Sequence, residues 1–145
     1  MIATQAARKL YGKNIVVDDV TLTLPRGVTS IIGPNGAGKS TLLSMVARLL
    51  PLSGGTVTVD GLDVTRTPSD ILARRLAILR QDNHIAARLT VRDLVAFGRF
   101  PHSKGRLTVE DKVQIDRAIG YLGLGDLESR FIDELSGGQR QRAFV

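Results

Sequence analysis

A glycine-rich segment in the first third of the chain carries the residue types that bind phosphate groups. Its sequence matches the pattern GxxxxGK[ST] in full, as Gly33-Pro34-Asn35-Gly36-Ala37-Gly38-Lys39-Ser40. Glycines let the backbone turn its N–H groups toward one point and let phosphate oxygens come close. We therefore predict that Gly33–Thr41 binds phosphates, with Lys39 reaching the outer phosphates and the Ser40 hydroxyl coordinating Mg²⁺.

A second glycine-containing segment, Leu135-Ser136-Gly137-Gly138-Gln139, lies about a hundred residues further along the chain. Ser136 is a favourable N-cap, and the residues Gln139 to Arg142 that follow have helical character. Two glycines and a serine at the start of a helix can form another anion-binding nest. A simple capped helix start is the alternative, and the pentapeptide alone does not decide between the two.

The residues around the first motif predict a strand, a loop and a helix in that order. Val28–Ile32 is rich in β-branched residues and predicts a buried, central strand that ends at Gly33. From Lys39 to Leu50, apolar residues recur at helical spacing and extend around the cylinder, which predicts a helix buried on most sides. Pro51 is expected to end that helix.

Four other segments complete the expected mixed α/β core. Val20–Leu24 and Thr56–Asp60 alternate apolar and polar residues, which predicts strands with one buried face. Pro68–Arg75 predicts a short helix, and Leu76–Leu79 predicts a short buried strand.

The pattern becomes helical in the second half of the chain. Thr90 with Asp93, and Thr108 with Asp111, have the spacing of capping boxes. The second box precedes one apolar helical face, made of Ile115, Ala118, Ile119 and Leu122. Residues 88–135 are therefore predicted to form a helical insert on the mixed core.

The composition of the chain indicates a globular domain and excludes several classes of site. The chain has 145 residues, 43% of them hydrophobic, which is enough for one domain with a real core. It has no cysteine, which excludes disulfides and thiol catalysis, and only two histidines. No apolar run reaches the length of a membrane span, and Met1–Lys9 lacks the apolar stretch of a signal peptide, so we expect a cytosolic protein.

The chain is basic, with a formal net charge of +6. Its arginines are scattered, and no aromatic residues alternate with them as a base-stacking surface would require. We therefore expect no nucleic-acid partner.

Taken together, the two glycine motifs resemble those of ATP-binding-cassette (ABC) ATPases. The loop has the GPNGAGKST form, Leu135–Gln139 looks like the signature motif, and the resemblance extends along the whole chain. It implies an α/β fold, a P-loop NTPase core of ABC type with an antiparallel β subdomain and an α-helical insert, truncated before the Walker B strand. The parts would be a nucleotide-binding core over residues 1–87, a helical subdomain over 88–135, and the signature motif with the start of its helix over 136–145.

The resemblance also implies roles for single residues. Tyr11 matches the aromatic residue that stacks on adenine, and Gln81 matches a glutamine placed near Mg²⁺ and the attacking water. Lys39 and Gln81 would then be the catalytic groups, and Ser40 and Gln81 the metal ligands. Ser136–Gln139 would contact ATP held by a second ATPase domain in a head-to-tail dimer. An ordinary strand tyrosine and an exposed loop amide are the alternatives for Tyr11 and Gln81.

The stretch Leu89–Thr108 narrows the resemblance to the ATPases of iron–siderophore importers, with haem and cobalamin importers close by. An amphipathic helix followed by a loop would explain its first half but not the Gly98-Arg99-Phe100-Pro101 ending. The resemblance implies an ATP-binding subunit that uses ATP and Mg²⁺ to drive import of an iron–siderophore complex through a membrane permease. Such a subunit sits peripherally on the cytoplasmic side of the membrane and meets a substrate-binding protein only indirectly.

The chain ends at Val145, inside the helix that follows the signature motif. The resemblance implies that the Walker B aspartate, the catalytic glutamate and the switch histidine would follow. We therefore expect residues 1–145 alone not to hydrolyse ATP at a useful rate. The alternatives are a non-transport ABC ATPase and a hydrolysis-dead nucleotide-binding fragment.

Overall fold

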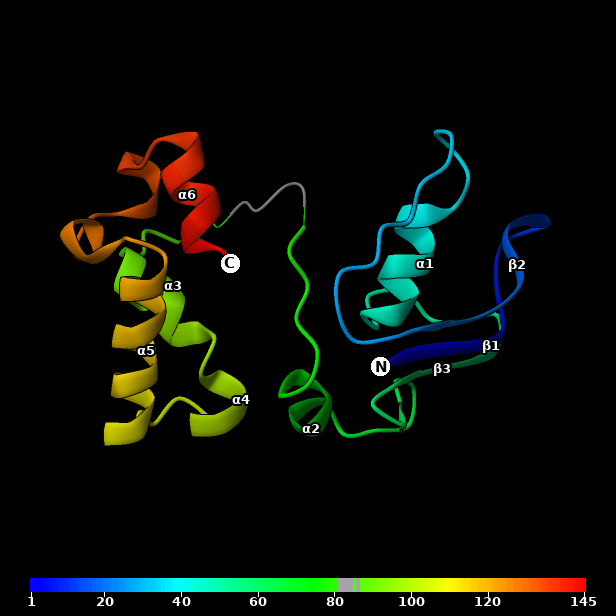
Figure 1. The fold of residues 1–145 in the computed structure, drawn as a ribbon, viewed down its shortest axis with the longest axis horizontal. Helices are drawn as coiled ribbons and strands as arrows, with labels where there is room; N and C mark the ends of the chain where they lie inside the picture. The colour runs from blue at the N-terminus through cyan, green and yellow to red at the C-terminus, as the bar shows by residue number, and fades with distance from the viewer. Residues whose placement is uncertain (81–84, 86) are drawn as a thin grey trace. The chain divides into compact units, whose positions relative to one another are not determined.

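The structure of the chain is a computed structural model that describes residues 1–80, 85 and 87–145 (Figure 1). The chain divides into two compact units, Met1–Ile78 and Leu79–Val145. The first unit contains a β-sheet and the second is helical, and each has its own hydrophobic core. The expected division at residues 1–87, 88–135 and 136–145 stays a prediction.

The first unit is built on a four-stranded antiparallel sheet with the order β2-β1-β3-β4. The strands are β1 (Ile2–Tyr11), β2 (Asn14–Leu24), β3 (Gly54–Val59) and β4 (Leu62–Asp63). The two segments with alternating residues lie in β2 and β3, so both predicted strands are confirmed.

Two helices accompany this sheet, α1 (Lys39–Val46) and α2 (Ser69–Ala73). Helix α1 lies over one face of the sheet (Figure 1), where its buried residues join the core formed by the strands. The core residues of the first unit are Ala7, Val17, Leu42, Met45, Val46, Val57, Val59, Val64 and Leu72. Helix α2 confirms the short helix predicted within residues 68–75.

Helix α1 is shorter and less enclosed than predicted. The chain turns after Val46, and Arg48 has a φ of +58°, which ends the helix well before Pro51. Leu43 is 47% exposed and Leu49 is 50% exposed. The predicted burial on most sides is therefore wrong, because only one face of the helix meets the sheet.

The predicted strands Val28–Ile32 and Leu76–Leu79 are not present, and both segments are irregular. A β-strand is stabilised by hydrogen bonds to a neighbouring strand, and none of the four strands of the sheet pairs with either segment. Val28 and Ile32 are almost fully exposed, at 101% and 91%. Their β-branched composition favours an extended backbone but does not supply the neighbour that a strand requires.

The second unit is helical, as predicted for the insert. Its helices are α3 (Val91–Phe97), α4 (Phe100–Ser103), α5 (Val109–Tyr121) and α6 (Gly137–Ala143), with 3₁₀ turns at Gly125–Leu127 and Ile132–Glu134. Helices α3, α5 and α6 share a core of Val91, Ile115, Ile119, Leu124, Ile132 and Ala143. In the described part of the chain, no helix combines the length and the apolar character needed to span a bilayer.

Both predicted capping boxes are confirmed. The Thr90 hydroxyl accepts a hydrogen bond from the N–H of Asp93, and the Asp93 carboxylate accepts one from the N–H of Thr90. Thr108 and Asp111 form the same pair at the start of α5. Because each box depends on residues only three apart, its spacing in the sequence is enough to predict it.

The Asp111 carboxylate also joins α4 to α5. One of its oxygens accepts hydrogen bonds from the N–H of Thr108 (2.9 Å) and from the Thr108 hydroxyl (2.8 Å), and the other accepts one from Nε of Arg99 (2.8 Å). The Asp111 side chain is only 4% exposed. The Thr108 N–H and hydroxyl, followed by Arg99, lower the pKa of Asp111 to about 2.

We expect Asp111→Asn to lower the thermal unfolding temperature at neutral pH, because it removes the charge that these donors stabilise. The folded-state pKa lies below the ordinary value of 3.8, so this stabilisation is present above about pH 4 and is lost as the pH falls toward about 2. Thermal unfolding followed across this range should show the difference between wild type and variant shrinking as the pH falls. Asp116→Asn is the control, since that carboxylate is 59% exposed and should show a smaller difference. A difference that grew on acidification would contradict the assignment.

Candidate functional site

The phosphate loop, Gly33–Thr41, bends sharply where it meets α1. Gly36 and Gly38 have positive φ angles of +84° and +81°, and Gly38 is the N-cap of the helix without any side-chain cap. The first helical hydrogen bond of α1 runs from the N–H of Leu42 to the carbonyl of Gly38 (2.8 Å). The N–H groups of Lys39, Ser40 and Thr41 therefore precede the helical ladder and are available to an anion.

Gly38 is held against strand β2. A Cβ built on Gly38 would lie 2.6 Å from the carbonyl oxygen of Val16 and 3.4 Å from a methyl group of Val17. No side chain fits this space, and the left-handed backbone disfavours one as well. The close approach fixes the end of the loop to the sheet, so the N–H groups at the start of α1 have a defined position.

The Lys39 ammonium is hydrogen-bonded to the backbone of the phosphate loop itself. Its Nζ donates hydrogen bonds to the carbonyl oxygens of Gly33 and Pro34, both at 2.7 Å. The adjacent Ser40 is exposed, so its hydroxyl is accessible from solvent. The Lys39 ammonium and the Ser40 hydroxyl would both bind charged phosphate oxygens more strongly than neutral carbonyl oxygens. The donors of this loop therefore suit a polyphosphate.

Tyr11 lies at the end of β1, next to the turn that leads into β2, and is 48% exposed. On the sheet, Lys9 pairs with Val17 and Tyr11 pairs with Asn14. Since Gly38 contacts Val16 and Val17, the sheet brings the end of β1 to the same region of the first unit as the phosphate loop. The position suits the predicted stacking role, which remains a prediction.

Sequence reasoning missed Lys9, which is only 7% exposed. Its ammonium lies 5.1 Å from the centre of the Tyr11 ring and donates a hydrogen bond to the carbonyl of Pro51 (2.7 Å). The one available signal was its spacing of two residues from Tyr11, which puts both side chains on the same face of a strand.

The signature segment lies in the second unit, at the start of α6. The Ser136 hydroxyl accepts a hydrogen bond from the N–H of Gln139 (3.4 Å), and the Gln139 amide oxygen accepts one from the N–H of Ser136 (3.0 Å). Both predictions for this segment, the N-cap and the helix, are thus confirmed. Among the described residues, a Cβ built on Gly137 or on Gly138 would meet no atom within 4 Å beyond its chain neighbours and the backbone of its own helix.

The predicted site residues thus fall into two groups. The loop Gly33–Thr41 and Tyr11 belong to the first unit, and Ser136–Gln139 belong to the second. Gln81, predicted to act on Mg²⁺ and water, lies outside the described residues.

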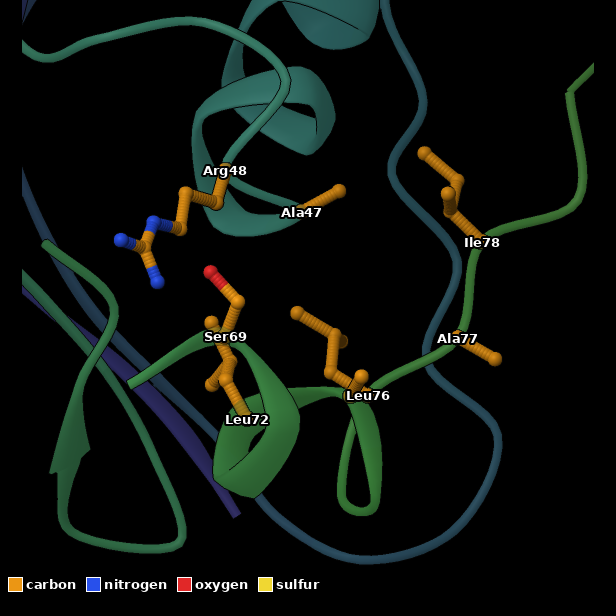
Figure 2. Close-up of a pocket in the computed structure, with 8 residues that line it drawn as sticks. Ala47, Arg48, Ser69, Leu72, Leu76, Ala77 and Ile78 are labelled. Carbon is orange, nitrogen blue, oxygen red and sulfur yellow. The ribbon is translucent and has the colours of Figure 1, made fainter. Parts of the chain in front are cut away.

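The first unit also has an apolar pocket of about 280 Å³ beside the C-terminal end of α1 (Figure 2). Arg48 lies at its edge and donates a hydrogen bond to the carbonyl of Thr67 (2.7 Å). Its lining includes no carboxylate and no residue of Gly33–Thr41, so the pocket is separate from the phosphate loop. Its lining is Ala47, Arg48, Ser69, Leu72, Ala73, Leu76, Ala77 and Ile78.

Comparison with known proteins gives one consistent family. The sequence model of the ABC transporter family matches residues 17–145. The chain is 53% identical over its whole length to the petrobactin import ATP-binding protein FatE of Bacillus anthracis, covering 58% of that protein. It is 41% identical to the ferric enterobactin transport ATP-binding protein FepC of Escherichia coli, over 93% of this chain and 51% of that one.

A solved structure described as the ATP-binding subunit of an ABC transporter has the same fold. The TM-score is 0.83 at 22% sequence identity, over 99% of this chain and 59% of the other. This likeness establishes an α/β fold of ABC type for the chain. The chain spans less than two thirds of the length of the relatives that it matches.

We expect Gly38→Ala to destabilise the protein more than Gly36→Ala does. Both changes force alanine into a left-handed backbone, which costs about 1–2 kcal/mol. Only at Gly38 would the added Cβ also overlap a backbone carbonyl, whereas the space around Gly36 is open. Urea denaturation of the two variants measures the difference in the free energy of unfolding. Equal losses would mean that the contact between the loop and Val16 does not constrain the fold.

Proposed function

Because this chain belongs to the ABC transporter family, we propose that it is the ATP-binding subunit of an importer for iron–siderophore complexes. In this proposal, binding and hydrolysis of ATP drive a membrane permease. The observation that carries it is the start of α1, where a loop held against the sheet leaves three N–H groups before the helical ladder, next to the Lys39 ammonium.

The loop would hold the phosphates of ATP. The N–H groups of Lys39, Ser40 and Thr41 would bind phosphate oxygens, and the positive end of the helix dipole would strengthen them. Lys39 would exchange its two carbonyl partners for phosphate oxygens, which accept stronger, charge-assisted hydrogen bonds. Bound MgATP supplies the free energy of its hydrolysis. Ser40 and Gln81 would hold the metal ion, and Tyr11 would carry the base.

The two glycines of the signature segment support a head-to-tail partner. Gly137 and Gly138 occupy the first turn of a helix, although glycine is a poorer helix former than alanine. No contact with the part of the chain that the structure describes requires them, because a Cβ at either position would meet open space there. We propose that the absence of side chains at these two positions lets the nucleotide and phosphate loop of a second ATPase domain come close to the start of α6. Ser136–Gln139 would then complete the nucleotide site of that second domain.

An apolar groove of about 320 Å³ in the second unit supports the permease as partner. Phe97 and Phe100 line it and are each more than half exposed, and both belong to the stretch Leu89–Thr108 that is typical of importer ATPases. Exposed aromatic residues beside a groove are favourable contacts for a partner helix. The subunit would thus be held on the cytoplasmic side of the membrane and meet a substrate-binding protein only through the permease.

The proposed cargo follows from the relatives. Proteins of 53% and 47% identity to this chain are named as petrobactin import ATP-binding proteins, and one of 41% identity is named for ferric enterobactin. Petrobactin and enterobactin are siderophores, so we propose a ferric siderophore as the transported complex.

Lys39→Ala tests the nucleotide site. We expect it to weaken ATP binding at least about tenfold, because a hydrogen bond from an ammonium to phosphate is lost. Isothermal titration calorimetry with MgATP on the full-length protein measures this. Arg48→Ala is the control, since it removes a cation from the opposite end of α1 and should leave affinity unchanged. Equal ATP affinities of wild type and Lys39→Ala would contradict the proposal.

Gly138→Ala tests the signature segment. We expect the protein to keep its thermal stability, because alanine is favourable in a helix and the added methyl group meets open space. ATP binding by calorimetry should also persist, since the phosphate loop is intact. Growth of a deletion strain on a ferric siderophore as the sole iron source should be restored by the wild type but not by this variant. Full restoration by Gly138→Ala would mean that these glycines make no partner contact.

A further inference from the structure

Lys9 is a buried lysine in a strand that otherwise exposes most of its polar residues. It is 7% exposed, whereas an ammonium is normally in water, and burial is unfavourable unless the charge has partners. The structure supplies two partners, the carbonyl of Pro51 at 2.7 Å and the ring of Tyr11 at 5.1 Å from its centre. The charged end of the Lys9 side chain is thus fixed between two partners. One is the backbone carbonyl of Pro51, in the segment after α1, and the other is the exposed ring of Tyr11.

The ammonium covers one face of the Tyr11 ring. Lys9 and Tyr11 are two residues apart on β1, so both side chains leave the strand on the same side. A cation over an aromatic ring is attracted by its π electrons and restricts the ring to orientations that keep the contact. Tyr11 remains 48% exposed, so part of the ring is still available to a ligand.

The strand beneath Tyr11 is tied to the segment that follows α1. Besides the bond from Lys9 to Pro51, the N–H of Ser53 donates to the carbonyl of Arg8 (2.8 Å), and the N–H of Leu10 donates to the Ser53 hydroxyl (3.0 Å). Three consecutive residues of β1 are thereby bound to residues 51–53. Because Gly38 contacts β2 at Val16, the same sheet is in contact with the residue before α1 and with residues 51–53, a few positions beyond its end.

We propose that Lys9 is a positioning residue for the nucleotide base. Its ammonium holds the Tyr11 ring from one side, so that the other side is presented to the base of a nucleotide whose phosphates lie on the loop. The inference rests on the proposed function, which puts the base on Tyr11. A ring held in advance loses less conformational entropy when the base stacks on it.

The test compares a ligand that has a base with one that has none. Affinities for MgATP and for magnesium tripolyphosphate are measured by calorimetry on the full-length wild type and on Lys9→Met, Lys9→Arg and Tyr11→Ala. We expect Lys9→Met to weaken ATP binding about 3- to 10-fold and to leave tripolyphosphate binding unchanged. Lys9→Arg keeps a cation over the ring and should bind ATP like the wild type.

A double substitution distinguishes positioning from a general loss of stability. If Lys9 acts through the ring, Lys9→Met should weaken ATP binding no further once Tyr11→Ala is present. An equal loss for ATP and tripolyphosphate in Lys9→Met would overturn the inference, since it would mean that Lys9 only anchors Pro51. Unchanged ATP affinity in Tyr11→Ala, an exposed position that tolerates the change, would overturn it as well. A wild type that binds neither ligand would instead overturn the proposed function, and this inference with it.

Discussion

The contact between Gly38 and the backbone of Val16 is the constraint on which the phosphate loop depends. A loop of glycines has many conformations, and its N–H groups form a binding site only if one of them is selected. Here the selection comes from the sheet, because the loop can reach α1 only by passing within van der Waals distance of β2. Position 38 therefore requires glycine for two reasons. Its backbone is left-handed, and a side chain would overlap the carbonyl of Val16. The position of the N–H groups relative to Tyr11 then follows from strand pairing.

The second unit is stabilised in another way, by ion pairs between its elements and by capped helix starts. Arg92 on α3 donates hydrogen bonds to Asp116 on α5 (2.6 Å) and to Glu128 (2.8 Å), and Arg99 binds Asp111. These pairs join elements that share a small apolar core, and a capping box orders the start of each of the helices α3, α5 and α6. Because Ser136 and Gln139 cap each other, the start of α6 is ordered by its own residues. This suits the role that we propose for the segment, because a surface ordered in advance loses less conformational entropy when a partner binds.

The features that could be predicted from the sequence are those whose partners lie close along the chain. The capping boxes, the helix after the phosphate loop and the alternating strands each depend on residues within a few positions. Strands at Val28–Ile32 and Leu76–Leu79 were predicted wrongly, because composition says nothing about whether a neighbour is present. Strand β1 was not predicted at all. Its pairing with β2 is irregular between Thr4 and Ala7, and this interrupts the alternation that would have indicated it.

Lys9 shows why the candidate site could be predicted only in part. In the sequence it is one of 20 lysines and arginines, and its partner Pro51 is 42 residues away, so its burial depends on how β1 meets the turn after α1. The phosphate loop is recognisable because its chemistry is local, whereas the support that we propose for the base is assembled by the fold. In the proposed function, phosphate binding, base stacking and partner approach would therefore depend on separate structural elements: the start of α1, the end of β1 and the start of α6. Since these elements do not share side chains, a substitution in one can change its own contribution while the other two stay intact, and affinity for the nucleotide need not change together with coupling to a partner.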